Sequence, residues 1–238
     1  MIIIASVAYL LGSIPFGYIL VKLFLKQDIR TTGSGNIGAT NVARSGNKGL
    51  AIATLLLDAA KGAVAVLWAG YKFSEMAGNW YLNNQVRFLA SDFEFVGGPA
   101  PDLTFLAVAA LFAIIGHCFP VLLKFKGGKG VATAIGAFAV LAPKAALIAL
   151  VCFFLVFAIT RYVSLASVFS AAVFPFLLLW LGPFSRKELI FLLLCAAASL
   201  LIIFKHHGNI RRLIAGTEPK FGRKAIGTND PMETEKNL

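Results

Sequence analysis

Long apolar runs constrain this chain more than any other feature of its sequence. Uncharged runs cover residues 1–21, 103–123 and 162–185, a shorter one covers 189–204, and 49–70 contains only two charged residues. A helix needs about 20 apolar residues to cross a bilayer. Charged residues make up 14% of the chain, whereas soluble domains contain about 25%. The sequence therefore predicts an all-α polytopic membrane protein.

The remaining apolar stretch, 130–160, is long and contains Pro143. Proline lacks the backbone N–H and disfavours helical geometry in the residue before it. We therefore predict two short helices here, about 130–142 and 144–160, which gives about seven transmembrane helices in all. For the same reason we expect the first helix to be kinked near Pro15.

The distribution of positive charge predicts the orientation. With the N-terminus outside, sixteen of the 22 Lys and Arg residues fall on inner segments and five on outer ones. Inner loops carry the excess of Lys and Arg, so the C-terminus is predicted to be cytoplasmic. Residues 1–238 then form a single integral membrane domain, with a long outer loop at about 71–102 and a polar C-terminal tail at about 213–238. If 130–160 were one helix, the second and third of the polar stretches described next would lie on opposite sides.

The first polar stretch, Gly33–Asn41, reads G-x-G-x-x-G. This pattern marks a dinucleotide-binding loop only within a βαβ unit, which does not fit between two membrane helices. Successive glycine N–H groups can instead cradle an oxyanion, and Arg44 can clamp a phosphate with two hydrogen bonds. Ser34, Asn36 and Asn41 add further polar groups, so we predict an anion site rather than a flexible loop.

The second polar stretch, Lys126–Gly130, lies directly before a predicted helix. It is not a Walker A loop, because Gly130 stands where Ser or Thr should follow Lys129. Glycine N–H groups, a helix N-terminus and a lysine together bind anions. The alternative is a turn with a positive-inside anchor. For Lys129 we predict contact with a phosphate.

The third polar stretch, His206–Arg212, combines histidine, asparagine and arginine. His206 and Asn209 are three residues apart and share one helical face. An imidazole titrates near neutral pH and can serve as a general base. A juxtamembrane basic cluster that binds anionic headgroups would explain the arginines, but it would not explain His206 and Asn209.

Three further ionisable residues fall within predicted helices. Asp58 and Lys61 are three apart, and intramembrane charges are costly and usually paired, so we expect them to neutralise each other. The alternative is that Lys61 faces the site. We expect His117 to be a hydrogen-bonded structural residue. No cluster of His, Cys, Asp and Glu has metal-ligand spacing, so neither a metal nor another cofactor is expected.

Taken in order, these motifs resemble the bacterial acyl-phosphate-dependent glycerol-3-phosphate acyltransferase family. The resemblance covers nearly the whole chain. Its motifs here are Leu11–Gly17, Gly33–Asn41 with Arg44, Asp58–Gly62, Gly116–Pro120, Lys126–Thr133 and His206–Arg212. The segment 71–102 looks longer than the family needs.

The resemblance implies transfer of a fatty acyl group from acyl phosphate to the sn-1 hydroxyl of glycerol 3-phosphate. The products would be lysophosphatidic acid and phosphate, in the first acylation step of bacterial phospholipid synthesis. Neither acyl-CoA nor acyl carrier protein would be a direct donor. The partners would be glycerol 3-phosphate, a long-chain acyl phosphate and membrane lipid. The soluble enzyme that makes acyl phosphate is a further candidate, and no nucleic acid is expected.

The resemblance also implies roles for individual residues. The residues expected to be catalytic are Ser34, Arg44, His206 and Asn209. The residues expected to bind substrate are Gly35, Asn36, Asn41, Gly127, Gly128, Lys129 and Gly130. Glu218 corresponds to the acidic residue that follows the last motif, with an expected structural role. The enzyme would be a multi-pass protein of the bacterial inner membrane, with its active site on the cytoplasmic face.

Two questions stay open at this stage. The proton acceptor for the sn-1 hydroxyl is either His206 or a substrate phosphate. The rival class is a membrane transporter of phosphorylated metabolites, which would place polar groups near the bilayer midplane and on both sides. Here the polar residues gather at one predicted face, with Asp58 and Lys61 as the deep pair.

Overall fold

The structure, a computed structural model, describes residues 1–76, 103–182 and 188–222, and throughout them the regular elements are helices. The predicted outer loop at 71–102 therefore lies mostly outside the described residues, as does the end of the polar tail at 213–238. The α-helices are α1 Ile2–Gly12, α2 Phe16–Leu25, α3 Ala39–Arg44, α4 Lys48–Met76, α5 Leu103–Cys118, α6 Val131–Leu141, α7 Pro143–Thr160, α8 Val163–Leu181, α9 Leu189–Lys205 and α10 His207–Ile214. Two short 3-10 helices, Ile29–Thr31 and Val121–Leu123, lie in the connections.

Within the described residues, five helical segments are long and apolar enough to cross a membrane. They are Ile2–Leu25 (α1 with α2), Lys48–Phe73, Leu103–Leu123, Pro143–Thr160 and Val163–Leu181. A sixth candidate is α9, which joins α10 at a bend of 55°, and α6 is a shorter apolar helix. The all-α, polytopic membrane class is thus confirmed. The number of seven crossings and the outside N-terminus stay predictions.

Both predicted proline breaks are confirmed. The first helical span is interrupted between Gly12 and Phe16, and Pro15 directly precedes α2. The stretch 130–160 is split into α6 and α7 at Ala142, and Pro143 occupies the first turn of α7. Proline is tolerated there because the first N–H groups of a helix have no intrahelical acceptor.

Small residues allow the central helices to approach closely. A Cβ added to Gly136 on α6 would overlap the carbonyl oxygen of Ala59 on α4. A Cβ added to Gly62 on α4 would likewise overlap the carbonyl oxygen of Thr133 on α6. In lipid, where apolar surface gains little from helix association, such backbone contacts are a main source of helix packing. The α4–α6 contact therefore holds the centre of the bundle.

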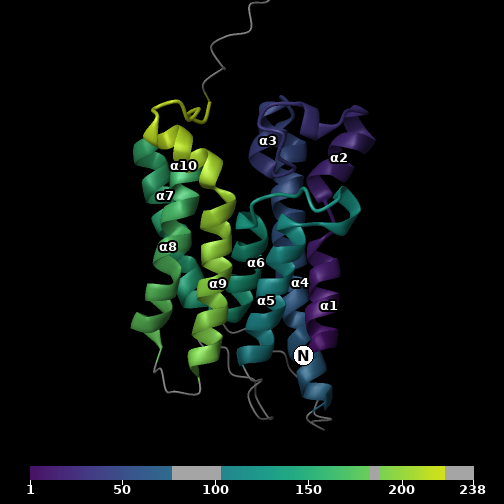
Figure 1. Ribbon diagram of the computed structural model, residues 1–238, viewed down its shortest axis with the longest axis vertical. Helices are drawn as coiled ribbons and strands as arrows, with labels where there is room; N and C mark the ends of the chain where they lie inside the picture. Colours follow the sequence, from purple (N-terminus) through teal and green to yellow (C-terminus); the bar gives the residue numbers. More distant parts are fainter. Residues whose placement is uncertain (77–102, 183–187, 223–238) are drawn as a thin grey trace, which may run out of the picture.

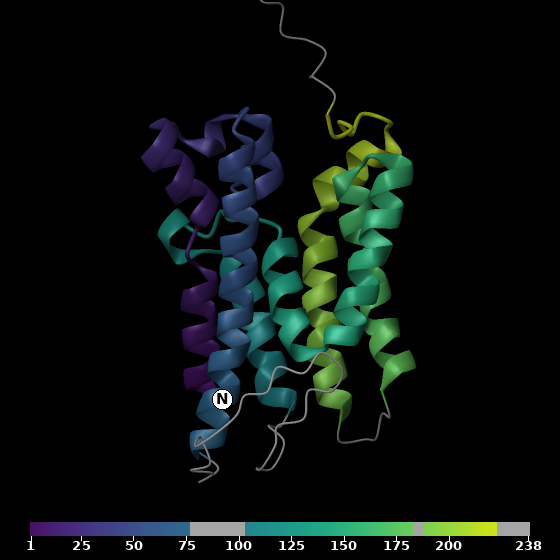
Figure 2. The ribbon, with the colours of Figure 1, turned by 180° about the vertical axis from the view of Figure 1, so that it is seen from behind.

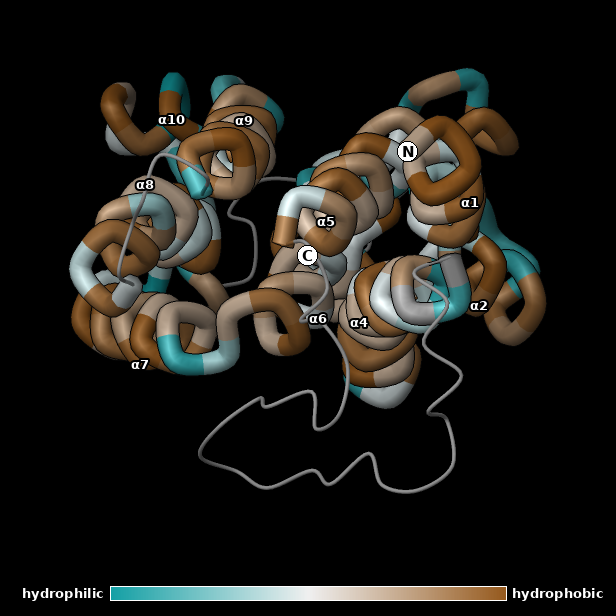
Figure 3. Tube along the Cα trace, turned by 90° about the horizontal axis from the view of Figure 1, so that it is seen from below, coloured by the Kyte–Doolittle hydropathy of each residue, from teal (hydrophilic) through white to brown (hydrophobic). Residues whose placement is uncertain are grey.

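The outer surface of the bundle is suited to lipid. Figure 3 views the bundle along its long axis, and hydrophobic positions dominate the helices in that view. Large apolar side chains remain exposed along several helices, among them Leu23, Phe24, Leu56, Leu147, Phe154, Ile159, Phe176, Trp180 and Leu200. In Figures 1 and 2, α7, α8 and α9 stand together on one side of the bundle and α1, α2 and α4 on the other.

The three polar stretches lie toward the same end of the bundle. Figure 1 places α3 and α10 at this end, with the connection between α5 and α6 slightly below them. The view from behind agrees (Figure 2). The alternative with 130–160 as one helix, which would have separated the second and third stretches, is thereby excluded. That this end faces the cytoplasm stays a prediction.

The α4–α6 contact predicts that Gly136→Val destabilises the protein, because the added methyl groups meet backbone. Overpacking of this kind costs about 1–3 kcal/mol, which corresponds to a drop in thermal midpoint of about 5 °C for a chain of this size. Thermal denaturation in detergent measures the effect. Ala60→Val is the matched control, since Ala60 lies on α4 with its side chain exposed. Equal midpoints for the two variants would contradict the packing argument.

Candidate active site

The first polar stretch is folded around the side chain of Asn41. Its Oδ1 accepts a hydrogen bond from the Ser34 backbone N–H at 2.8 Å, and its Nδ2 donates to the carbonyl oxygens of Thr32 and Asn36 at 3.1 and 2.8 Å. Asn41 is 2% exposed. Its amide is therefore used within the loop, whereas the side chain of Ser34 is exposed. Asn41 shapes the loop that presents Ser34.

Arg44 ends α3 at the edge of this loop, and its side chain is exposed. The positive charge of Arg44 contributes to lowering the pKa of Lys129 in the second stretch. The end of α3 therefore lies within electrostatic reach of the α5–α6 connection. The first and second stretches thus share one electrostatic environment.

Lys129 joins the second stretch to the third. Its Nζ donates a hydrogen bond to Oδ1 of Asn209 on α10. Burial lowers the pKa of the Lys129 ammonium to about 8, and the nearby Glu218 carboxylate opposes that shift. Lys129 is thus still mostly protonated at pH 7 while being partly withdrawn from water. A cation in this state attracts a phosphate more strongly than an exposed lysine does.

The glycine loop offers backbone donors beside this lysine. Gly128 N–H donates to the carbonyl oxygen of His117 at 3.0 Å. Among the residues described, no acceptor is found for the N–H groups of Lys129 and Gly130. Gly130 has a φ of 84° and directly precedes α6, so the loop turns into a helix N-terminus. Unpaired N–H groups at such a turn favour an anion.

His206 lies between α9 and α10, with 3% of its surface exposed. Its Nδ1 is 2.7 Å from the carbonyl oxygen of Ile202. Because a carbonyl can only accept, Nδ1 carries the hydrogen of that bond, and in the neutral ring Nε2 is left as the acceptor. The neighbouring His207 is exposed and bonds similarly to Phe204 at 3.0 Å. The two histidines differ mainly in burial.

Glu218 ties the third stretch together. Its carboxylate, 7% exposed, accepts hydrogen bonds from Asn209 Nδ2 at 2.6 Å and Ser164 Oγ at 2.7 Å. It also forms an ion pair with Arg212 Nε at 2.7 Å. Burial alone would raise the pKa of Glu218, but these three donors hold it below its usual value. The carboxylate thus holds the Asn209 side chain in place, and the Oδ1 of Asn209 accepts the hydrogen bond from Lys129.

The sequence did not indicate Ser164. It lies inside an apolar run and has no charged neighbour along the chain. Its pairing with Glu218 spans 54 residues and brings the start of α8 to the segment after α10. Only the fold reveals such a contact. Arg212 was predicted only as part of a basic cluster, and its specific partner was also not foreseen.

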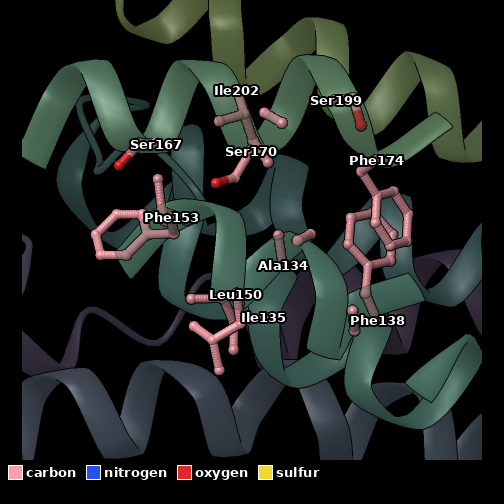
Figure 4. A pocket seen from close by; sticks show the side chains of 14 residues that line it. Ala134, Ile135, Phe138, Leu150, Phe153, Ser167, Ser170, Phe174, Ser199 and Ile202 are labelled. Atoms are coloured by element: carbon pink, nitrogen blue, oxygen red, sulfur yellow. The ribbon is translucent and has the colours of Figure 1, made fainter. Parts of the chain in front are cut away.

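An apolar pocket lies between helices of the bundle (Figure 4). It is lined by residues of α6, α7, α8 and α9, and Phe138 stacks on Phe174 beside it with ring centroids 4.1 Å apart. Val131, next to Gly130, and Ile202, the partner of His206, both line the pocket. The lining therefore includes the residue that follows the glycine loop and the residue whose carbonyl bonds His206.

No group of three or more His, Cys, Asp or Glu residues that could hold a metal ion occurs among the described parts of the chain. The site is instead built from cations, amides and backbone N–H groups around Lys129. Together, the fold and the site define an integral membrane protein with a polar, cationic centre toward one end of its bundle and an apolar pocket between its helices.

Comparison with known proteins specifies this class further. The family profile "Glycerol-3-phosphate acyltransferase" matches residues 2–216. A glycerol-3-phosphate acyltransferase of Bartonella henselae is 40% identical over 94% of this chain and 93% of its own length. Another from Trichlorobacter lovleyi is 46% identical over 90% of this chain and 94% of its own. The chain therefore belongs to the glycerol-3-phosphate acyltransferase family, and the predicted family resemblance is confirmed.

A solved structure agrees with the fold. The crystal structure of PlsY (YgiH), an integral membrane glycerol 3-phosphate acyltransferase, in its glycerol 3-phosphate form superposes with a TM-score of 0.76 at 34% identity. The match covers 93% of this chain and 95% of that one. Its lysophosphatidic acid form superposes with a TM-score of 0.73 at 33% identity. The present chain is thus an integral membrane acyltransferase of phospholipid synthesis.

The Glu218 contacts predict that Glu218→Gln lowers the thermal midpoint at pH 7, because a hydrogen bond to a charged group contributes about 1.5–3 kcal/mol. Since the folded pKa of Glu218 is depressed, its stabilisation is complete above the ordinary glutamate pKa and is lost as pH falls through the lower, folded value. The difference from wild type should therefore shrink toward acidic pH.

Thermal denaturation between pH 7 and pH 3 measures this difference. Glu75→Gln is the matched control, because Glu75 is exposed on α4 and its partner Lys72 is exposed as well. A pH-independent difference for Glu218→Gln, or one no larger than that of Glu75→Gln, would argue against the assignment.

Proposed function

We propose that this enzyme transfers a long-chain acyl group from acyl phosphate to the sn-1 hydroxyl of glycerol 3-phosphate. The hydroxyl oxygen forms an ester bond to the acyl carbon, the bond from that carbon to the phosphate oxygen breaks, and inorganic phosphate leaves. The product is lysophosphatidic acid. The observation that carries the proposal is the partly buried Lys129, which donates to Asn209 and stands two residues before Val131, a residue that lines an apolar pocket.

Both substrates are anionic at the reacting end, so the site must hold two phosphates close together. We assign the phosphate of glycerol 3-phosphate to Lys129 and the free N–H groups of the Gly127–Gly130 loop. The related PlsY was crystallised in a glycerol 3-phosphate form, which supports this substrate. Asn209 then acts by positioning Lys129, because its amide connects that lysine to Glu218.

The donor phosphate is assigned to the first stretch. Ser34 and Arg44 are exposed and face solvent, and Gly35 and Asn36 lie in the same loop. Arg44 can clamp a phosphate with two parallel hydrogen bonds. Asn41 is assigned a positioning role instead of direct contact, since its amide is already bonded to the loop backbone.

The acyl chain is assigned to the apolar pocket between α6 and α8. Its lining begins at Val131 beside the glycine loop, so a chain in the pocket would place its carbonyl carbon near Lys129 and His206. Acyl phosphate is an activated anhydride, and the chemistry mainly requires two anions to be juxtaposed and the oxyanion of the tetrahedral intermediate to be stabilised.

For the proton, we propose His206 as general base. Its Nδ1 is bonded to Ile202, which leaves Nε2 free to accept the proton of the sn-1 hydroxyl. A substrate phosphate is the competing acceptor, and the second experiment below decides between the two. A covalent acyl-Ser34 intermediate is not needed, because the donor is already activated.

The remaining assignments follow from charge and topology. We propose one membrane domain over residues 1–238 with about seven crossings, an outside N-terminus and a cytoplasmic active site in the bacterial inner membrane. The excess of Lys and Arg at the polar end supports this orientation. A soluble enzyme that makes acyl phosphate would then reach the site from the same side.

The proposal predicts glycerol 3-phosphate-dependent phosphate release from palmitoyl phosphate by the purified protein in lipid or detergent, and no turnover with palmitoyl-CoA. Ser34→Ala and Arg44→Ala should reduce this rate at least about tenfold, the effect of losing one charged hydrogen bond. Lys72→Ala, at the opposite end of α4, is the control and should keep the wild-type rate. Turnover with the thioester alone would refute the donor assignment.

The base assignment predicts that His206→Ala lowers kcat by about 10²–10⁴-fold at saturating substrates, the usual contribution of general-base catalysis. His207→Ala is the matched control, because it removes an exposed imidazole from the adjacent position. Steady-state kinetics on both variants measures the effect. A near-normal kcat for His206→Ala would instead assign the proton to a substrate phosphate.

A further inference from the structure

Three ionisable side chains lie buried in the bundle and take no part in the proposed chemistry. Asp58 and Lys61 on α4 are 2% and 5% exposed, and His117 on α5 is 3% exposed. Ionisable groups inside a membrane protein are costly and usually mark a function. Mutual neutralisation explains the presence of the first two but not of His117.

Lys61, at one end of this cluster, is bonded to the break between α1 and α2. Lys61 Nζ forms an ion pair with Asp58 Oδ1 at 2.7 Å and donates to the carbonyl oxygen of Ile14 at 2.7 Å. Ile14 lies between α1 and α2, where the helix is interrupted before Pro15. Lys61 thus ties the centre of α4 to this interruption.

The upper end of the cluster contacts the glycine loop. His117 Nδ1 faces Asp58 Oδ1 at 3.6 Å, which is longer than a hydrogen bond. The opposite edge of the ring lies against Gly128, because a Cβ added there would meet Nε2, Cδ2 and Cε1 of His117. The backbone of His117 holds the same residue, since its carbonyl accepts the Gly128 N–H at 3.0 Å.

The imidazole of His117 is also what requires a glycine at position 128. Gly128 is not among the described glycines with positive φ, so its backbone could accept alanine. The three atoms nearest to an added Cβ all belong to the His117 ring. The ring of His117 on α5 therefore limits how closely the Gly127–Gly130 loop can approach that helix.

We propose that His117 is a positioning residue whose ring sets the distance between the Gly127–Gly130 loop and α5, and thereby places the loop for the phosphate of glycerol 3-phosphate. The inference rests on the proposed assignment of this loop to glycerol 3-phosphate. Without the ring the loop can sink, and its N–H groups and Lys129 move away from the phosphate. A displacement of about 1 Å in a positioning group can cost about 100-fold in rate.

The experiment compares His117→Ala, Gly128→Ala and the double variant, with KM measured separately for glycerol 3-phosphate and palmitoyl phosphate. Each single variant should raise KM for glycerol 3-phosphate at least about tenfold, the equivalent of 1.4 kcal/mol. KM for palmitoyl phosphate should stay within about twofold. In the double variant, the methyl group added at position 128 can occupy space left by the imidazole. The fold-increase in KM for glycerol 3-phosphate should therefore be well below the product of the fold-increases in the two single variants.

Cys195→Ala is the matched control for a cavity in the bundle, because Cys195 is 1% exposed on α9 and outside this cluster. It should leave both KM values near wild type. Gly128→Ala leaves all three ionisable groups in place, so it tests the contact even if His117→Ala fails to fold. Calorimetric binding of glycerol 3-phosphate to each folded variant provides a readout that does not depend on the acyl donor.

The inference is overturned if the two single effects multiply in the double variant, or if both substrates lose affinity equally. It is also overturned if His117→Ala binds glycerol 3-phosphate as the wild type does. Wild-type protein that binds glycerol 3-phosphate but does not turn over acyl phosphate refutes the proposed donor and leaves the binding test of His117 intact. Wild-type protein that does not bind glycerol 3-phosphate refutes both.

Discussion

The carboxylate of Glu218 is the interaction on which the polar end of this protein depends. It accepts hydrogen bonds from Ser164 on α8 and Asn209 on α10, and it pairs with Arg212 on α10. Asn209 in turn bonds Lys129, which precedes α6. A buried carboxylate is tolerated only when its oxygens are paired and hydrogen-bonded. The contacts that satisfy this carboxylate also connect α8, α10 and the start of α6, which are far apart in the sequence. The orientation of Lys129 is therefore set by a residue 89 positions further along the chain.

The arrangement separates two physical tasks that the family's chemistry combines. In the proposed reaction, cations and free N–H groups around Lys129 hold phosphate, while the apolar pocket lined by Val131 takes the acyl chain. Positioning residues support the two polar loops, since Asn41 shapes the first loop from within and His117 packs against Gly128 of the second. Few groups are left for direct chemistry, which suits the proposed acyl phosphate donor, because that donor is already activated and proximity can supply much of the rate.

Much of this could be predicted from the sequence because the relevant constraints are local. Apolar length predicts the helices, and Pro15 and Pro143 predict the breaks that are found. The gathering of the polar stretches at one end follows from counting the crossings. The contact between Ser164 and Glu218 could not be predicted, because it joins residues 54 positions apart. The contact between His117 and Gly128 could not be predicted either, because it depends on how the connection after α5 folds back. For Asn41, the sequence indicated a polar role, but only the loop conformation distinguishes contact with a ligand from contact with the backbone.

The break before Pro143 has a further consequence. It limits α6 to 11 residues, which at 1.5 Å per residue is about 16 Å, roughly half of the 30 Å hydrocarbon layer. The glycine loop at its start lies below the level of α3 and α10 in Figure 1. In the proposed reaction, the water-soluble glycerol 3-phosphate would therefore bind close to the membrane surface. The acyl phosphate donor could react there without leaving the depth at which it lies in the leaflet. The lysophosphatidic acid would then form with its headgroup at the same depth as those of the surrounding lipids. It could leave the enzyme by lateral diffusion alone.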